Sequence, residues 1–279
     1  MTEPSPPATR TCALVGPGRA GGAVGAVLVA AGWRVGRVAG RSPDADSVRA
    51  AAALFGAEAA SVESAGQGAT LVILATPDGS IREVAGVVAP SLEPGALVVH
   101  LSGAVGVAAL DGIAAVRDDV ELGALHPLQT LPSVELGAAR LPGSWAAVAG
   151  PPRVHDLATE LGLVPFTVDE HQRAAYHAAA SVASNHVVAL LGQVERIAAA
   201  VGAPFAAFEP LVRATVDNAF ALGPQAALTG PVARGDVETV ARHLAAVDEE
   251  ERRAYKALAS AAARLAGRDD DAALREALA

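Results

Sequence analysis

The stretch Thr11-Cys-Ala-Leu-Val-Gly16-Pro-Gly18-Arg-Ala-Gly21-Gly22 decides the fold of this chain. An apolar run typical of a buried strand ends at Gly16, and the glycine spacing GxGxxG then opens a stretch of helical character. The first glycine permits a tight turn, the second lets the backbone approach a diphosphate, and the third allows the helix to pack closely on the strand. Free N–H groups and the positive end of the helix favour a bound anion. The sequence therefore predicts a strand, turn and helix that bind a dinucleotide, although a glycine-rich turn of this kind can also be purely structural.

The next predicted strand, 33–39, favours one kind of dinucleotide. It ends in Gly40-Arg41-Ser42, about 20 residues beyond the glycines, where NAD-binding folds place an acid on the ribose 2′-hydroxyl. A cation and a hydroxyl instead suit a 2′-phosphate, so we expect NADP(H). The alternative is that Arg41 is a solvated loop residue and Ser42 merely caps a helix. The predicted cofactor-binding residues are Gly16, Gly18, Arg19, Ala20, Gly21, Gly40, Arg41, Ser42, Ala75, Thr76 and Pro77.

Short apolar runs alternate with helical stretches from residue 11 to residue 168, as in a doubly wound, mostly parallel Rossmann sheet. Most of these runs are continuously apolar, which is typical of strands covered by helices on both faces. The predicted strands are 11–16, 33–39, 70–75, 96–101, 121–125, 145–149 and 164–168, with a weaker one at 59–62. We expect helices to start near Ser42-Pro43, near Asp78 as a cap, and at Pro151-Pro152.

After residue 168 the strand signals stop, and an all-α C-terminal domain is expected. Its predicted helices are 170–201, 205–222, 232–247 and 248–265, followed by a charged tail after Gly267. The predicted organisation is a disordered tail over 1–10, an NADP-binding Rossmann domain over 11–168, and a helical domain for substrate binding and dimerisation over 169–279.

Composition excludes several classes of partner. The 279 residues carry a net charge of −9, which argues against nucleic acid and anionic membranes because both require a basic face. The apolar stretches are interrupted before the ~20 residues that a membrane helix needs, and residues 1–10 do not resemble a signal peptide. Cys12 is the single cysteine and is expected to be a small buried hydrophobe. We expect a cytoplasmic protein without a metal, since the histidines show no metal-ligand spacing.

Polar residues at predicted strand ends and on one helix form a candidate catalytic site. Ser102 and His126 follow strands, and His126 is the first candidate for the acid that protonates a reduced carbonyl, because histidine exchanges protons near neutral pH. His177, Ser181 and Asn185 stand at i, i+4 and i+8, which puts them on one helix face. A structural histidine and a hydrogen-bonded domain interface are the alternatives that the sequence leaves open.

Several longer motifs carry a resemblance that covers nearly the whole chain. They are Gly-Pro-Gly-Arg-Ala-Gly at 16–21, Ala-Thr-Pro-Asp at 75–78, His-Leu-Ser-Gly-Ala at 100–104, His-Pro-Leu-Gln-Thr at 126–130, Ala-Ser-Asn-His at 183–186 and Thr-Gly-Pro at 229–231. With these motifs the chain resembles Rossmann-like proteins that carry a C-terminal helical domain of unknown function. That family is similar to ketopantoate and pyrroline-5-carboxylate reductases and to prephenate dehydrogenase.

The resemblance implies an NADPH-dependent reductase of a small 2-oxo acid, with 2-dehydropantoate as the leading substrate because some similar proteins are regarded as alternative ketopantoate reductases. Ser102 and His126 match the serine and the His-Pro pair of prephenate dehydrogenases, and Asn185 matches a substrate-binding asparagine of the 6-phosphogluconate type. That type has a catalytic lysine where this chain has Ser181, so the proton donor must be His126, His177 or a water. An imine reductase and a non-catalytic NADP(H)-binding regulator remain alternatives.

Predicted substrate-binding residues are Gln129, Thr229 and Arg234. A homodimer through the helical domain is expected.

Overall fold

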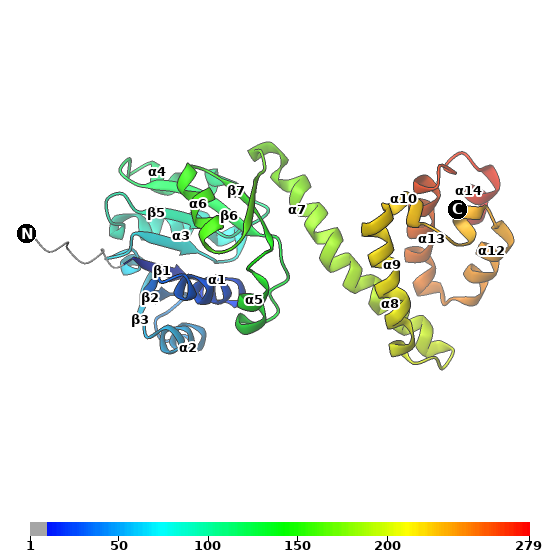
Figure 1. The fold of residues 1–279 in the computed structure, drawn as a ribbon, viewed down its shortest axis with the longest axis horizontal. Coiled ribbons are helices and arrows are strands. Elements are labelled where there is room, and N and C mark those ends of the chain that lie inside the picture. Colours follow the sequence, from blue (N-terminus) through cyan, green and yellow to red (C-terminus); the bar gives the residue numbers. More distant parts are fainter. Residues whose placement is uncertain (1–9) are drawn as a thin grey trace, which may run out of the picture. The chain divides into compact units, whose positions relative to one another are not determined.

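Eight strands form one sheet in the order β3-β2-β1-β4-β5-β6-β7-β8 (Figure 1). All neighbours pair in parallel except β6 and β7, which are antiparallel. The computed structural model describes residues 10–279, so the predicted tail, apart from Arg10, lies outside the described residues. The predicted mostly parallel Rossmann sheet is confirmed. The strands are β1 (Thr11–Val15), β2 (Arg34–Ala39), β3 (Glu58–Ala60), β4 (Leu71–Leu74), β5 (Leu97–His100), β6 (Glu121–Pro127), β7 (Trp145–Ala149) and β8 (Val164–Thr167).

Both faces of the sheet are buried, which explains why its strands are continuously apolar. Cys12 and Leu14 of β1 belong to one core cluster, whereas Ala13 and Val15 belong to the other. The first face packs against α1 (Arg19–Ala30), α2 (Asp46–Phe55), α5 (Val134–Arg140) and α6 (Pro152–Glu160), and the second against α3 (Ile81–Val88) and α4 (Asp111–Ala114). Burial raises the pKa of the Cys12 thiol to about 12, and Cys12 is the small buried hydrophobe that was predicted.

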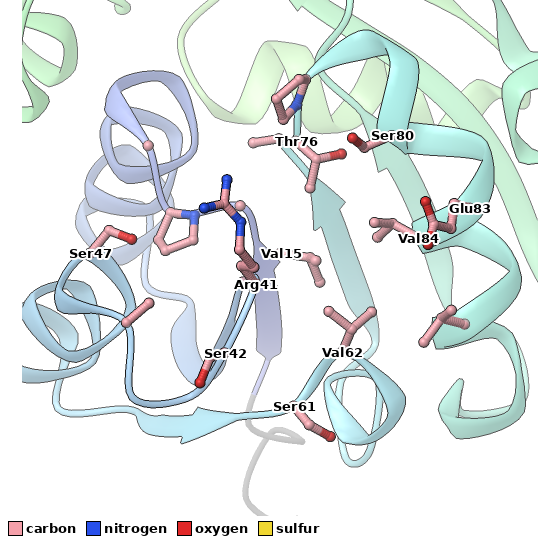
Figure 2. A pocket seen from close by; sticks show the side chains of 18 of the residues that line it. Val15, Arg41, Ser42, Ser47, Ser61, Val62, Thr76, Ser80, Glu83 and Val84 are labelled. Atoms are coloured by element: carbon pink, nitrogen blue, oxygen red, sulfur yellow. The ribbon is translucent and has the colours of Figure 1, made fainter.

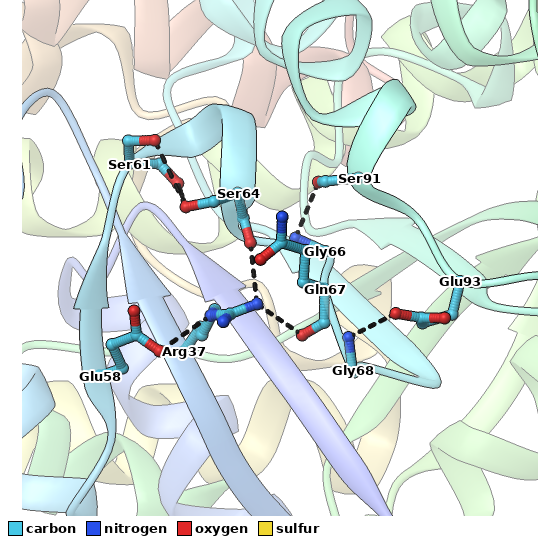
Figure 3. A network of polar contacts seen from close by, with 9 residues as sticks. All are labelled: Arg37, Glu58, Ser61, Ser64, Gly66, Gln67, Gly68, Ser91 and Glu93. Atoms are coloured by element: carbon cyan, nitrogen blue, oxygen red, sulfur yellow. Dashed lines mark hydrogen bonds and ion pairs between the residues drawn. The ribbon is translucent and has the colours of Figure 1, made fainter.

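A polar network at the β2–β3 edge holds the loop that follows β3 (Figure 3). The guanidinium of Arg37 on β2 donates to Glu58 on β3 at 3.1 Å and to the carbonyl oxygens of Ser64 and Gln67 at 3.2 and 2.9 Å. The backbone amide of Gly66 donates to the Ser91 hydroxyl at 3.0 Å. These bonds fix the backbone of residues 64–68, which connects the segment after β3 to the start of β4.

Two predicted helix starts are wrong. Ser42 does not cap α2, which begins at Asp46; the Ser42 hydroxyl accepts from the Asp44 amide at 3.2 Å and so stabilises a turn instead. Asp78 opens a short 3₁₀ turn ahead of α3, and no side-chain capping bond is present at either start. Pro151 and Pro152 do introduce α6, with Pro152 at its first position.

The segment predicted as one helix over 170–201 contains three kinds of helix. A 3₁₀ turn (Glu170–Gln172) leads into α7 (Arg173–Ser181), a π-helical turn (Val182–His186) follows, and α8 (Val187–Ala200) completes it. The chain divides into two compact units at Ser184 and Asn185, within the π turn. A π turn holds one residue more than an α turn. Such turns are frequent at functional sites.

The second unit, residues 185–279, is entirely helical among the described residues. Its helices are α8, α9 (Glu209–Leu222), α10 (Pro224–Ala227), α11 (Pro231–Arg234), α12 (Val237–Ala246), α13 (Glu249–Leu265) and α14 (Ala272–Leu278). Its core cluster comes from α11 to α14 and includes Val240 and Leu274. The helix predicted over 232–247 is broken at Gly235, whose φ is +73°, and the predicted tail after Gly267 instead contains α14, capped by Asp271.

No helix in residues 10–279 is long and apolar enough to cross a membrane.

Candidate functional site

The turn between β1 and α1 has the geometry of a phosphate cradle. Gly16 has φ +88°, and a Cβ there would lie 2.7 Å from backbone atoms of Ala75 and Thr76. At Gly18 a Cβ would meet no atom within 4 Å, so the backbone there faces open space. Gly21 packs the helix on the strand, because a Cβ would lie 2.5 Å from the Gly16 carbonyl oxygen. Gly16 therefore serves the turn and Gly21 the packing, as the spacing predicts, and Gly18 leaves its backbone open.

A cavity of about 1050 Å³ opens at this turn (Figure 2). Every predicted cofactor-binding residue lines it except Gly21. The neighbouring segments contribute further lining residues that were not predicted: Val15, Pro17, Pro43, Ala45, Ser47, Ser61, Val62, Glu63, Ser80, Glu83, Val84, Val87 and Leu131. Of these, 61–63 follow β3, so the rule that ligands sit at the carboxyl ends of parallel strands could have found them.

Two polar groups in this cavity are available to a ligand. The hydroxyl oxygen of Thr76 is buried and has no hydrogen-bond partner among the described residues. The exposed Arg41 forms neither an ion pair nor a hydrogen bond with any described residue, and Figure 2 shows it on the side of the cavity that carries Ser42 and Ser47. Buried polar groups are normally paired, so an orphaned hydroxyl beside an open glycine backbone fits a bound polar ligand such as a dinucleotide.

A cluster of aromatic rings surrounds His126 at the end of β6. Its Nδ1 lies 2.7 Å from the hydroxyl oxygen of Tyr176 on α7, and the two rings meet edge to face. The His177 ring also lies edge to face with His126, at 5.9 Å between centroids. A Cβ at Gly103 would lie within 2.8 Å of both imidazoles, so the absence of a side chain at this position makes room for the pair. Burial, aided by the charges of His177 and Arg173, lowers the pKa of His126 to about 4.

Ser102 is tied into the loop after β5. Its hydroxyl oxygen accepts from the amides of Ala104 and Val105 at 3.1 and 3.2 Å, and its carbonyl oxygen accepts from Nη2 of Arg173 at 2.9 Å. Arg173 is only 1% exposed, and its Nη1 has no hydrogen-bond partner within the described part of the chain. The Ser102 hydroxyl thus has a structural role and keeps its own proton free to donate.

Strand pairing sets three of these residues at one level. Leu74 pairs with His100, and His100 pairs with Ala124. Thr76, Ser102 and His126 each lie two residues beyond these paired positions, at the carboxyl ends of β4, β5 and β6. The orphaned hydroxyl of the cavity and the histidine cluster therefore share the same edge of the sheet.

Within the first unit, the predicted residues Ser181 and Gln129 form no hydrogen bond or ring contact with His126. Ser181 ends α7, and Gln129 lies on an exposed loop with its side-chain oxygen accepting from the Thr130 amide at 2.8 Å. Asn185, Thr229 and Arg234 are the predicted residues that belong to the second unit: Asn185 lies in the π turn, exposed Thr229 precedes α11, and Arg234 ends it.

Tyr176 and Arg173 are the residues near His126 that the sequence analysis missed. Tyr176 adjoins His177, and Arg173 lies one helical turn before it on α7, so the helix that carries the predicted histidine also carries both. A tyrosine within an alanine-rich helix was the available signal. No group of three or more histidine, cysteine or acidic residues that could hold a metal ion occurs within residues 10–279.

Comparison with solved structures relates the fold to oxidoreductases. A protein from Bacteroides fragilis that is provisionally assigned as an NADP oxidoreductase shares 21% identity over 92% of this chain and 98% of its own, with a TM-score of 0.76. Protein TM1727 from Thermotoga maritima shares 24% identity over 97% and 98%, with a TM-score of 0.65. An imine reductase from Streptomyces aurantiacus shares 20% identity over 96% and 98%, with a TM-score of 0.66. These identities show a common fold.

Family models match both parts of the sequence, whereas no curated protein matches it. Residues 5–127 match a Rossmann-like domain, and residues 147–262 match a domain of unknown function, DUF2520. The resemblance noted in the sequence motifs is confirmed. The chain carries a Rossmann-like domain followed by a DUF2520 domain.

Proposed function

We propose that the chain is an NADP-dependent oxidoreductase. The observation that carries this proposal is the cavity at the glycine turn, where an open backbone, the orphaned Thr76 hydroxyl and the uncompensated Arg41 guanidinium meet. The fold supports it, because a similar fold occurs in a protein provisionally assigned as an NADP oxidoreductase and in an imine reductase.

The backbone around Gly16 and Gly18 would hold the diphosphate, and Thr76 would contact the ribose or nicotinamide end. Arg41, Ser42 and Ser47 would hold the 2′-phosphate through charge-assisted hydrogen bonds. When bound, the reduced cofactor supplies a hydride, which is one proton with two electrons, to the substrate. Two carboxylates, Glu63 and Glu83, line the same cavity, so the preference for NADPH depends on which group the ribose 2′ position faces.

Calorimetric titration with NADPH and NADH tests the cofactor assignment. A charge-assisted bond contributes about 1.5–3 kcal/mol, so NADPH should bind roughly 10 to 100 times more tightly than NADH, and Arg41→Ala should remove most of that ratio. The matched control is Arg49→Ala, because Arg49 lies on α2, is paired with Asp46 and does not line the cavity. Equal affinity for both dinucleotides, or an unchanged ratio in Arg41→Ala, would contradict NADP specificity.

For the substrate we propose a small 2-oxo acid, and 2-dehydropantoate is the first to test because of the motif resemblance. Cyclic imines form the second class, since an imine reductase has a similar fold. NADPH consumption across both classes distinguishes them. Tight NADPH binding without turnover of any member would instead favour a non-catalytic regulator.

Within the first unit, we assign the contact with the reacting oxygen to His126, with Ser102 beside it. His126 is neutral near pH 7 because its pKa is lowered to about 4, so it would act as an imidazole N–H donor and not as an imidazolium acid. His126→Ala should reduce turnover by roughly 10²–10⁴-fold. The substrate contacts expected of Gln129, Asn185, Thr229 and Arg234 remain predictions.

We also propose that the second unit pairs with its copy. Helices α8 and α9 expose Val188, Leu211, Phe220 and Leu222 at 68%, 65%, 89% and 62% of their surfaces. A cavity of about 530 Å³ lies beside them, lined by apolar residues that include Leu191, Phe205 and Val216 and by Glu209, Arg213 and Asp217. Extended apolar surface of this kind marks an interface, and most soluble oligomers are symmetric homodimers.

A further inference from the structure

The hydroxyl of Tyr176 and Nδ1 of His126 form a bond that the proposed function does not use. The two atoms lie 2.7 Å apart, and the tyrosine approaches from α7 while the histidine extends from β6. We propose that Tyr176 is the proton source behind His126: its phenol donates to Nδ1, which leaves the proton of His126 on Nε2 for the substrate oxygen. This inference rests on the proposed oxidoreductase function and makes Tyr176 a positioning residue that acts through His126.

His126 cannot serve alone as a reservoir of protons at neutral pH. Its partly buried ring lies against His177 and near Arg173, and both neighbours disfavour a positive charge on it. A neutral imidazole that gives up its single N–H proton must take another at its second nitrogen, or it becomes an unstable anion. The group at that second nitrogen is Tyr176.

Tyr176 is built to hold a proton and to lose it transiently. Burial raises the pKa of its phenol, so the hydroxyl is protonated at neutral pH. The Phe166 ring packs edge to face against it at 5.8 Å between centroids and fixes its orientation. The buried guanidinium of Arg173 acts on the phenol with a positive charge that favours the phenolate. Opposing influences of this kind suit a relay, which needs a stable donor and a tolerated anion.

The proton balance closes within this cluster. Reduction of a carbonyl carbon leaves one proton to be added at oxygen. As the bond from Nε2 to hydrogen breaks, the substrate oxygen gains that proton, Nδ1 gains the phenol proton, and Tyr176 becomes a phenolate. A solvent proton then adds to Nε2 while Nδ1 returns its proton to the Tyr176 phenolate, which restores both groups to their starting states. The charged or titratable groups that act on this pair are His100, Asp78, His177 and Arg173 on His126, and Arg173 on Tyr176.

The alternative arrangement has the opposite direction of donation. If Nδ1 carried the hydrogen, it would donate to the tyrosine oxygen and leave Nε2 as a bare acceptor, which cannot give a proton to substrate. His100 illustrates a fixed case, because its Nδ1 accepts from the Ser102 amide at 3.3 Å and its Nε2 faces the Gly106 carbonyl at 3.0 Å. The tautomer of His126 therefore distinguishes donation by Tyr176 from donation by His126.

Nitrogen-15 NMR of histidine-labelled, cofactor-free protein at pH 7.5 measures that tautomer. The signals of His126 are assigned by their loss in His126→Gln. We expect a protonated Nε2 and an unprotonated Nδ1 in the wild type, and a shift of the Nδ1 signal in Tyr176→Phe. A wild-type protein with its proton on Nδ1 would overturn the relay, and this result does not require a known substrate.

The chain contains a matched control in its second unit. Nδ1 of His243 lies 2.8 Å from the hydroxyl of Tyr255, and the rings also meet edge to face. This pair belongs to the second unit, whereas the glycine turn and the His126 cluster belong to the first. Tyr255→Phe removes the same bond, so it should alter the His243 signals and leave those of His126 and the turnover unchanged. Equal effects of Tyr255→Phe and Tyr176→Phe on turnover would contradict a specific relay.

Turnover measurements provide a second test of the inference. In Tyr176→Phe, kcat should fall by roughly 10²-fold, near the lower end for loss of a positioned proton donor, while KM and NADPH affinity stay unchanged. An unchanged kcat in a folded Tyr176→Phe variant would overturn the inference. Failure to bind either dinucleotide would instead overturn the proposed function, and the tautomer measurement would still stand by itself.

Discussion

The amide of Gly16 donates a 2.8 Å hydrogen bond to the carbonyl of Ala39, the last residue of β2. This bond joins the glycine turn after β1 to the segment that continues into Gly40 and Arg41. One backbone contact therefore holds Gly16, which would lie at the diphosphate, against the segment that leads to Arg41, which would touch the 2′-phosphate. The glycines of this turn differ in their surroundings. Substitutions at different glycines should therefore affect either the stability of the fold or the binding of the cofactor.

Gly16→Ala should destabilise the protein. Its φ of +88° is unfavourable for alanine, and the new Cβ would lie 2.7 Å from backbone atoms of Ala75 and Thr76. Backbone strain of this kind costs of the order of 1–3 kcal/mol, and the clash with β4's continuation adds to it. Chemical denaturation should show a lowered free energy of unfolding, and an unchanged midpoint would contradict the geometry of this turn.

Gly18→Ala should leave folding intact and weaken cofactor binding. Its φ of −75° is normal for alanine, and its Cβ would enter open space at the cavity. A methyl group there keeps a diphosphate away from the backbone, and loss of one charge-assisted hydrogen bond corresponds to roughly 10 to 100-fold in affinity. Chemical denaturation measures whether the stability is unchanged, and titration with NADPH measures the loss of affinity. Normal affinity in this variant would show that the ligand does not approach Gly18.

Gly103→Ala should disturb the histidine pair without touching the cofactor cavity. Its Cβ would lie 2.7 Å from Cε1 of His126 and 2.8 Å from Cδ2 of His177, so both rings must move. Overpacking typically costs about 1–3 kcal/mol, and the bond from His126 to Tyr176 should lengthen or break. Turnover should fall while NADPH affinity is retained. The control is Gly86→Ala on α3, where a Cβ meets no atom within 4 Å.

The first unit was largely predictable because its signals are local. Apolar runs and a glycine spacing identify strands and the turn, and strand direction then places Thr76, Ser102 and His126 at one edge. Ser42 and Gly235 show the limit of such signals. Ser42 resembles a cap, but its side chain bonds within a turn, and a glycine within an apparently continuous helix breaks it through a positive φ.

Contacts between distant segments were not predictable. Nothing local marks Tyr176 as the partner of His126, since the two are 50 residues apart and meet only when α7 packs beside the end of β6. The burial of Arg173 likewise depends on backbone carbonyls of the loop after β5. The π turn after α7 has no sequence signal either, because it depends on the packing of the surrounding helix and not on residue type.

Stability should fall between pH 7 and pH 4 through His126. Its pKa is about 6.5 in an unfolded chain and about 4 in the folded protein, so below pH 6.5 the unfolded state binds a proton that the folded state does not. The stability is therefore complete above pH 6.5 and is lost as the pH falls toward 4, by up to roughly 3 kcal/mol. Denaturation at pH 7.5 and pH 4.5 should show this loss in wild type and a smaller one in His126→Gln. A parallel decline in both proteins would assign the effect to other groups, such as the buried His100, whose pKa is also lowered.

Phe220→Glu should convert the proposed dimer into a monomer. Phe220 is 89% exposed on α9, and in a twofold interface each substitution acts twice. Burying one phenylalanine contributes about 1.5–3 kcal/mol, so losing two should weaken association by at least roughly 10²-fold, and paired carboxylates at the axis weaken it further. Light scattering at micromolar concentration measures the mass of both proteins. Val116→Glu is the matched control, because Val116 is 65% exposed in the first unit and its replacement should leave the mass unchanged. A wild type that is monomeric at these concentrations would contradict the proposed pairing, and a dimeric Phe220→Glu would move the interface away from α9.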